Sequence, residues 1–146
     1  MNLVIYFSRS GICKKVSDVL SESIECETIE LKDNMNWKGL FGFIRAGYHS
    51  NKGSSIDYLI KELDFNNYDE IFIIAPIWAG KVQPTVRTFI SDNSLHKARL
   101  ILTHASKEAN EMMIRNNKFI TRKKPVYFCL KDVYKSDFKE KLNNQL

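Results

Sequence analysis

The sequence predicts an α/β domain built on a doubly wound sheet of five parallel strands, in the order 2-1-3-4-5, with helices on both faces. Apolar runs of strand length alternate along the chain with segments of helical periodicity. The two strongest runs, residues 3–7 and 71–75, are apolar throughout, as parallel strands covered on both faces are. Right-handed crossovers would bring the loops after both runs to one edge of the sheet.

The first part of the chain predicts a strand, a helix, a second strand and an insertion. Residues 3–7 form the first strand, and residues 12–25 a helix whose apolar positions recur every three or four residues. Residues 28–31 alternate in polarity, which indicates a strand nearer an edge. Residues 39–48 predict a helical insertion that packs near a ligand bound at the carboxyl ends of the strands. The alternative is a plain crossover helix that packs on the sheet. A polar loop is expected at residues 50–55.

The remaining elements continue the alternation. We expect, in chain order, a strand at 70–75, an exit loop at 76–81, a helix at 84–90, a strand at 99–103, a helix at 107–116, a strand at 125–130 and a helix up to 143. Pro84 suits the first turn of its helix, where a missing N–H is tolerated. Ser136 is the expected N-cap of the last helix.

Length and composition predict a single domain spanning residues 1–146. The chain has 44% hydrophobic residues, enough for a substantial core. It has no run approaching the roughly 18 apolar residues of a membrane span, and its first residues lack the pattern of a signal peptide. We therefore expect a cytoplasmic protein.

The formal net charge of +5 is concentrated toward the end of the chain. From residue 115 onward there are nine Lys or Arg against three Asp or Glu, with the run Arg122-Lys123-Lys124 the densest part. Such runs are usually solvated. Nucleic-acid binding is disfavoured because no interleaved aromatics or recognition-helix pattern accompany the charge. An acidic protein partner or an anionic substrate fits this charge better.

The cysteines predict neither a disulfide framework nor a zinc site. Cys13, Cys26 and Cys129 are odd in number and widely spaced. Cys26 and Cys129 are expected in the core. Cys13 falls at a helix N-terminus, where a thiol can have a lowered pKa and be reactive.

The loop after the first strand has the chemistry of an anion site. Ser8 and Ser10 offer hydroxyl donors, Gly11 removes a Cβ near the backbone, and Arg9 adds positive charge. The following helix begins with N–H groups that lack intrahelical partners. Alternatively, Ser10 only caps this helix and Gly11 only turns the chain.

Three loops together resemble those of the flavodoxin family. Ser8-Arg9-Ser10-Gly11 is similar to its phosphate loop, and Pro76-Ile77-Trp78-Ala79-Gly80 to the loop that contacts the flavin ring. His104-Ala105-Ser106 matches the third loop. The resemblance implies noncovalent FMN, no catalytic side chain beyond the flavin chemistry, and no metal. The implied cofactor-binding residues are Ser8, Arg9, Ser10, Gly11, Ile12, Cys13, Pro76, Ile77, Trp78, Ala79, Gly80, Lys81, His104, Ala105 and Ser106.

The residues leave two functions open. The first is an FMN-binding redox protein that takes electrons from a reductase or NAD(P)H and passes them to a small quinone-like acceptor or a protein partner. The second is a flavodoxin-fold interaction module with weakened FMN binding, because Ile12 and Cys13 stand where the family has more polar residues. A homodimer is compatible with either.

Overall fold

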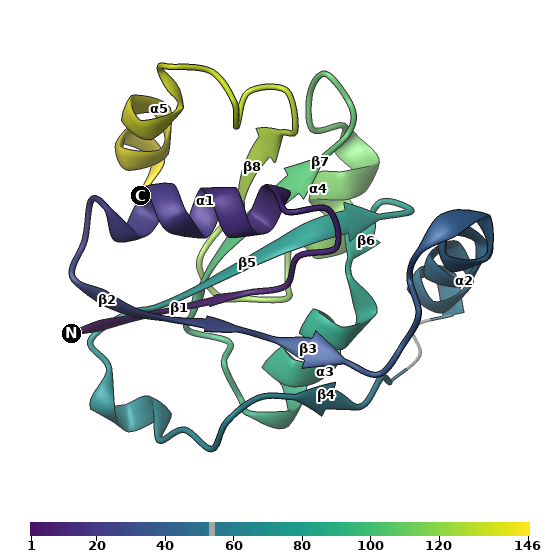
Figure 1. Cartoon of the computed structure of the whole chain (residues 1–146), viewed down its shortest axis with the longest axis horizontal. Coiled ribbons are helices and arrows are strands. Elements are labelled where there is room, and N and C mark those ends of the chain that lie inside the picture. The colour runs from purple at the N-terminus through teal and green to yellow at the C-terminus, as the bar shows by residue number, and fades with distance from the viewer. Residues whose placement is uncertain (53–54) are drawn as a thin grey trace.

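The computed structural model describes residues 1–52 and 55–146, and its centre is a parallel sheet (Figure 1). The strands run in the order β2-β1-β5-β7-β8, which confirms the predicted order and the doubly wound α/β architecture. Their bounds are β1 (Asn2–Tyr6), β2 (Cys26–Glu30), β5 (Ile71–Trp78), β7 (Arg99–His104) and β8 (Val126–Cys129).

Two hydrophobic clusters cover the two faces of the sheet. On one face, α1 (Ile12–Ser21) and α5 (Phe138–Gln145) pack against Val4, Ile74 and Ile101. On the other face, α3 (Pro84–Asp92) packs against the strand side chains that point away from the first cluster. The side chains of β1, β5 and β7 are consequently buried on both faces, which explains their uninterrupted apolar sequences.

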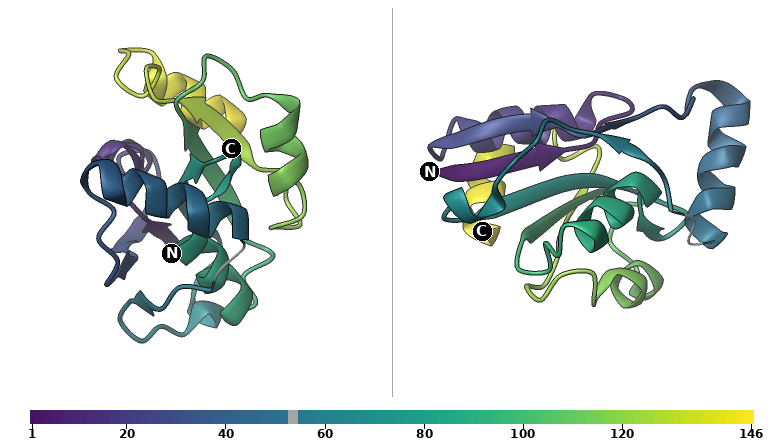
Figure 2. Two further views of the ribbon diagram at one scale, coloured as in Figure 1. Left: turned by 90° about the vertical axis from the view of Figure 1, so that its right-hand side faces the viewer. Right: turned by 90° about the horizontal axis from the view of Figure 1, so that it is seen from below.

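In its described residues, the long connection from β2 to β5 supplies no helix of the kind that covers a sheet face. It contains a short antiparallel pair, β3 (Lys32–Asp33) and β4 (Tyr58–Leu59), and a 3₁₀ turn, η1 (Phe65–Asn67). Its helix α2 (Gly39–Lys52) stands beyond the carboxyl end of the sheet in the right-hand view of Figure 2. The plain crossover helix considered as an alternative is therefore wrong, and the insertion beside the strand ends is what the structure shows.

Several boundaries differ from the sequence prediction. The polar loop expected at residues 50–55 is still helical up to Lys52, and residues 53 and 54 of that loop lie outside the described residues. The first helix ends at Ser21 instead of residue 25. The helix expected from residue 107 is α4 (Glu111–Asn117), which begins where the Asn110 side chain accepts a hydrogen bond from the Met113 N–H at 3.0 Å.

Two further differences concern short elements. The N-cap position of α5 is held by Asp137 and not by Ser136. Residues expected to form an exit loop after β5 instead form a hairpin, because β5 continues to Trp78 and pairs with β6 (Lys81–Val82). Within the described ranges, no helix has the length and apolar character needed to cross a membrane, and no group of side chains suits a metal ion.

Candidate functional site

A pocket of about 480 Å³ lies at the carboxyl ends of β1, β5 and β7. Helix α2 stands beyond the same end of the sheet (Figure 1). This is the switch point of the sheet, where the connections from β1 and β5 leave in opposite directions and where doubly wound folds bind ligands. It is lined by Ser8, Arg9, Ser10, Ile12, Cys13, Ala46, Gly47, Pro76, Ile77, Trp78, Ala79, Thr103, His104, Ala105 and Leu130. Its size lies in the usual range for small-molecule sites.

The rim formed by the β1–α1 loop is suited to an anion. The Gly11 N–H donates to Ser8 Oγ at 3.0 Å, which folds the loop back on itself. The first intrahelical bond runs from Lys15 N–H to the Gly11 carbonyl at 2.9 Å, so the N–H groups of residues 12–14 precede it. These groups carry the positive end of the α1 dipole to the pocket edge. The exposed side chains of Arg9 and Ser10 stand at the same rim.

Cys13 does not have the reactive thiol that its position at the start of a helix suggests. It lies on the side of α1 that packs on the sheet with Val16 and Leu20, and is only 2% exposed. Its sulfur lies 3.3 Å from Thr103 Oγ1. Burial raises the pKa of the Cys13 thiol to about 12, although the contact with Thr103 opposes the shift. The expectation of a lowered pKa is therefore wrong, since desolvation outweighs the helix dipole.

Cys13 should consequently resist thiol reagents in the folded protein. At about pH 8, a thiol of pKa about 12 has a thiolate fraction on the order of a thousandfold below that of an ordinary cysteine. Alkylation with iodoacetamide followed by peptide mass spectrometry should modify half-buried Cys26 first and Cys13 only after unfolding. Equal rates at both cysteines in the folded protein would contradict the structure.

The hairpin between β5 and β6 forms one wall of the pocket. Trp78 pairs with Lys81, so the turn consists of Ala79 and Gly80, both with positive φ angles of 49° and 76°. Two such residues make the turn that matches the twist of paired strands. A Cβ at Gly80 would also lie 2.8 Å from Met112 Cε of α4. Glycine at this position thus satisfies both the backbone conformation and the close approach of α4.

Asn117, a residue that the sequence did not single out, fixes this hairpin from α4. Its side chain is fully buried, donates to the Gly80 carbonyl at 3.1 Å and accepts from the Val82 N–H at 2.8 Å. The neighbouring Asn116 makes a longer contact of 3.4 Å with the same carbonyl. The Gly80 carbonyl is therefore held in place.

Replacing Asn117 with Ala should destabilise the protein much more than replacing Asn116 with Ala. The first change leaves the buried Val82 N–H without its partner and costs about 2–4 kcal/mol, whereas the second removes one long, half-buried contact and costs less than about 1 kcal/mol. Urea unfolding followed by circular dichroism measures both. Similar losses of unfolding free energy in the two variants would show that the hydrogen bonds of Asn117 do not hold the hairpin in place.

Trp78 is held at the pocket by aromatic neighbours, one of which is fixed by a half-buried carboxylate. Its ring centroid lies 5.0 Å from that of Trp37 and 6.0 Å from that of Phe7, and the Arg9 guanidinium lies 6.0 Å from it on the solvent side. Trp37 Nε1 donates to the Asp33 carboxylate at 2.9 Å. That carboxylate also accepts from the Met35 N–H and from the Thr85 hydroxyl on α3. Sequence reasoning missed Asp33 and Trp37, because their roles depend on contacts between distant segments.

His104 is the buried titratable group of the pocket. It is 3% exposed, and its Nδ1 has no hydrogen-bond partner among the residues that the structure describes. Burial lowers the pKa of the imidazole below its ordinary value of 6.5, and the Ser106 backbone and the Asp132 carboxylate oppose the shift. A neutral imidazole with an unused ring nitrogen is a group that a polar ligand in the pocket could satisfy.

The pKa of His104 predicts a loss of stability toward acid. The unfolded chain takes up this proton near pH 6.5 and the folded protein only at lower pH, so the free energy of unfolding falls as the pH drops below about 6.5. Urea titrations between about pH 7 and pH 5 should show this slope, and His104→Gln should reduce it. If the His104→Gln variant has the same slope as the unchanged protein, the loss of stability toward acid does not come from His104.

The pocket gathers most of the residues that the sequence suggested, from three separate segments. Of the predicted cofactor-binding residues, Gly11, Gly80, Lys81 and Ser106 do not line it. Their roles, like those of the lining residues toward a ligand, stay predictions. The structure adds Ala46 and Gly47 from α2, Thr103 from β7, and Leu130. Thr103 lies near the carboxyl end of β7 and Leu130 directly follows β8, positions that could have suggested them.

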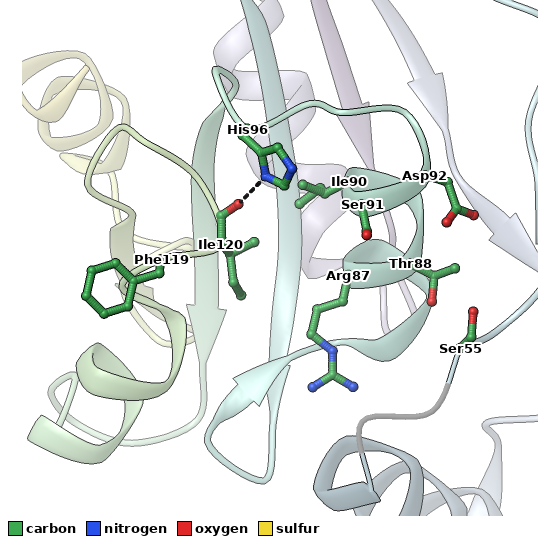
Figure 3. Close-up of a pocket in the computed structure, with 9 residues that line it drawn as sticks. All are labelled: Ser55, Arg87, Thr88, Ile90, Ser91, Asp92, His96, Phe119 and Ile120. Atoms are coloured by element: carbon green, nitrogen blue, oxygen red, sulfur yellow. Dashed lines mark hydrogen bonds between the residues drawn. The ribbon is translucent and has the colours of Figure 1, made fainter.

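A second pocket, of about 400 Å³, lies between α3 and the segment around Ile120 (Figure 3). His96 Nδ1 lies 3.2 Å from the Ile120 carbonyl, and the Phe119 ring points away from Arg87 and Asp92. Its polar side chains do not converge on a common point in this view, so it is a weaker candidate than the pocket at the strand ends.

The strand order and the position of the pocket define a flavodoxin-like fold, and solved structures support it. The chain is similar to a flavoprotein from Lactobacillus acidophilus NCFM crystallised with FMN, with 20% identity, a TM-score of 0.66, and coverage of 88% of this chain and 89% of that chain. The apo-form of that flavoprotein, solved by NMR, matches with 21% identity, a TM-score of 0.60 and the same coverage.

A proposed flavoprotein from Bacteroides uniformis ATCC 8492 is similar over 99% of this chain and 96% of its own, with 19% identity and a TM-score of 0.75. No protein-family profile matches the sequence. No curated protein matches it either. The comparisons thus establish the fold.

Proposed function

We propose that the pocket at the strand ends binds FMN noncovalently and that the protein transfers electrons through it. The observation that carries the proposal is the meeting of an anion-binding helix N-terminus, an aromatic wall and a buried imidazole around one pocket. FMN has a phosphate at one end and a flat heteroaromatic ring at the other, so its two ends match these features. The flavoproteins of the same fold, one of them crystallised with FMN, support this reading.

The donor set of this chain fits such a ligand. The N–H groups at the start of α1, with the hydroxyl of Ser10 and the charge of Arg9, would hold the phosphate. Ile77, Trp78 and Leu130 offer apolar contact to the ring, and Trp78 is kept in position by Trp37. His104 would offer its ring nitrogen to a polar edge of the ligand. Bound FMN supplies reversible electron uptake, while the protein orients it and limits its contact with water.

One observation favours the alternative of an interaction module with weakened FMN binding. The Cys13 thiol faces Thr103 in the core, and Ile12 adds no polar group to the loop. Phosphate binding therefore depends on backbone N–H groups and few hydroxyls. The spectrum of the purified protein decides between the two functions, since only the first requires a bound flavin.

The decisive test compares FMN with riboflavin, which has the same ring but no phosphate. We expect a flavin spectrum after purification or reconstitution, and FMN affinity at least about tenfold above riboflavin affinity, because the α1 N-terminus binds the phosphate. Ser10→Asp places a negative charge at that rim and should abolish most of the preference. Ser136→Asp, which adds the same charge at an exposed position near α5, should leave it unchanged.

A colourless protein that takes up neither flavin would contradict the proposal of FMN binding and favour the interaction module. Equal affinities for FMN and riboflavin would exclude the assignment of the phosphate site. For electron transfer, the reduced FMN-loaded protein should be reoxidised by a soluble quinone without oxygen. If an acceptor is not reduced by the reduced, FMN-loaded protein but is reduced by free reduced FMN, the pocket does not serve electron transfer to small acceptors.

A further inference from the structure

Helix α2 carries large apolar side chains on its outer surface. Leu40, Phe41, Ile44 and Tyr48 are all more than half exposed, and Phe41 is 83% exposed. Leu40, Ile44 and Tyr48 are spaced four residues apart and Phe41 lies beside them, so the four form one stripe along the helix. We call it the α2 stripe. Exposed apolar stretches of this kind mark interaction surfaces.

The α2 stripe is not the side by which the helix packs on the protein. Ala46, roughly opposite the stripe on the helix, is buried and joins the core cluster, and Ala46 and Gly47 line the pocket. The right-hand view of Figure 2 shows α2 standing off the end of the sheet. The stripe is therefore on the outside of a projecting helix, where it can meet a surface without rearrangement of the fold.

The charges beside the stripe select an anionic partner. Arg45 and Lys52 flank one side of it, and residues 39–52 include no Asp or Glu. Lys52 Nζ lies 3.0 Å from the Tyr48 hydroxyl and 5.3 Å from its ring centroid, so the cation follows the edge of the stripe. A second copy of the chain would bring the same positive charges together, which disfavours pairing of two stripes.

We propose that α2 lies in the interface of an anionic phospholipid bilayer. The arrangement fits that surface: Leu, Phe and Ile on a convex helix, a Tyr at the edge, and basic side chains that reach the lipid headgroups. The net charge of +5 adds attraction to an anionic leaflet. Because Ala46 and Gly47 of the same helix line the pocket, docking places the pocket beside the lipid surface. This inference does not depend on whether the pocket binds FMN.

The test is flotation of the purified protein with vesicles of DOPC alone and of equimolar DOPC and DOPG. We expect binding to the anionic vesicles at about 0.1 M salt, much weaker binding at about 0.5 M salt, and little binding to DOPC. Phe41→Ser with Ile44→Ser should weaken binding by more than about tenfold. Arg45→Gln and Lys52→Gln should each weaken it about fivefold.

The chain provides matched controls. Phe119 is 84% exposed, nearly the same as Phe41, and lies outside α2, so Phe119→Ser should not change vesicle binding. The exposed Lys97 precedes β7 at the opposite end of the sheet, which makes Lys97→Gln the control for lost charge. Flavin content and circular dichroism of each variant separate lipid binding from folding and from the FMN site.

Three results would overturn the proposal. The first is failure of the folded protein to bind anionic vesicles. The second is equal loss of binding in the α2 and control variants, which would mean that charge or exposure anywhere on the surface suffices. The third is sedimentation of the protein as a dimer that Phe41→Ser dissociates, which would assign the stripe to a second copy of the chain.

Discussion

The parallel pairing of β1 with β5 determines where everything else in this protein can lie. Leu3 to Tyr6 align with Ile71 to Ile74, although more than sixty residues separate the two strands in the sequence. Since the strands run in the same direction, the chain must return to the amino end of the sheet before β5 begins. Both carboxyl ends then meet at one edge, and the loops that follow them face each other across the pocket.

The loops at that edge are held by polar side chains from other elements. Asp33 joins Trp37, the backbone of Met35 and Thr85 of α3, while Asn117 of α4 joins both sides of the β5–β6 hairpin. Half-buried Asp33 and buried Asn117 thus each satisfy several partners. These contacts from other elements hold the pocket walls in place.

The sequence predicted the sheet well because its strands are buried on both faces, and continuous apolar runs such as residues 71–75 have few alternatives. The resemblance of the three loops to those of a known family indicated residues that line the pocket, although the expected exit loop after β5 is a hairpin. The sequence could not give the direction of the Cys13 side chain, which depends on how α1 rotates against β7. It also missed β6, since two residues after a tight turn carry no periodic signal, and Asn117, whose partners lie 35 and 37 positions away.

In the insertion between β2 and β5, one residue, Trp37, contacts both the pocket wall and helix α2. Trp37 packs on Trp78 at the pocket, and it also receives the first turn of α2, where a Cβ at Gly42 would lie 2.2 Å from the Trp37 backbone carbonyl carbon. No side chain larger than hydrogen fits there, so Gly42 sets how closely the helix approaches. Asp33 fixes Trp37 and thereby the start of α2 as well. The same tryptophan therefore contacts both the start of α2 and the pocket wall, so the position of α2 and the position of Trp78 depend on one buried residue.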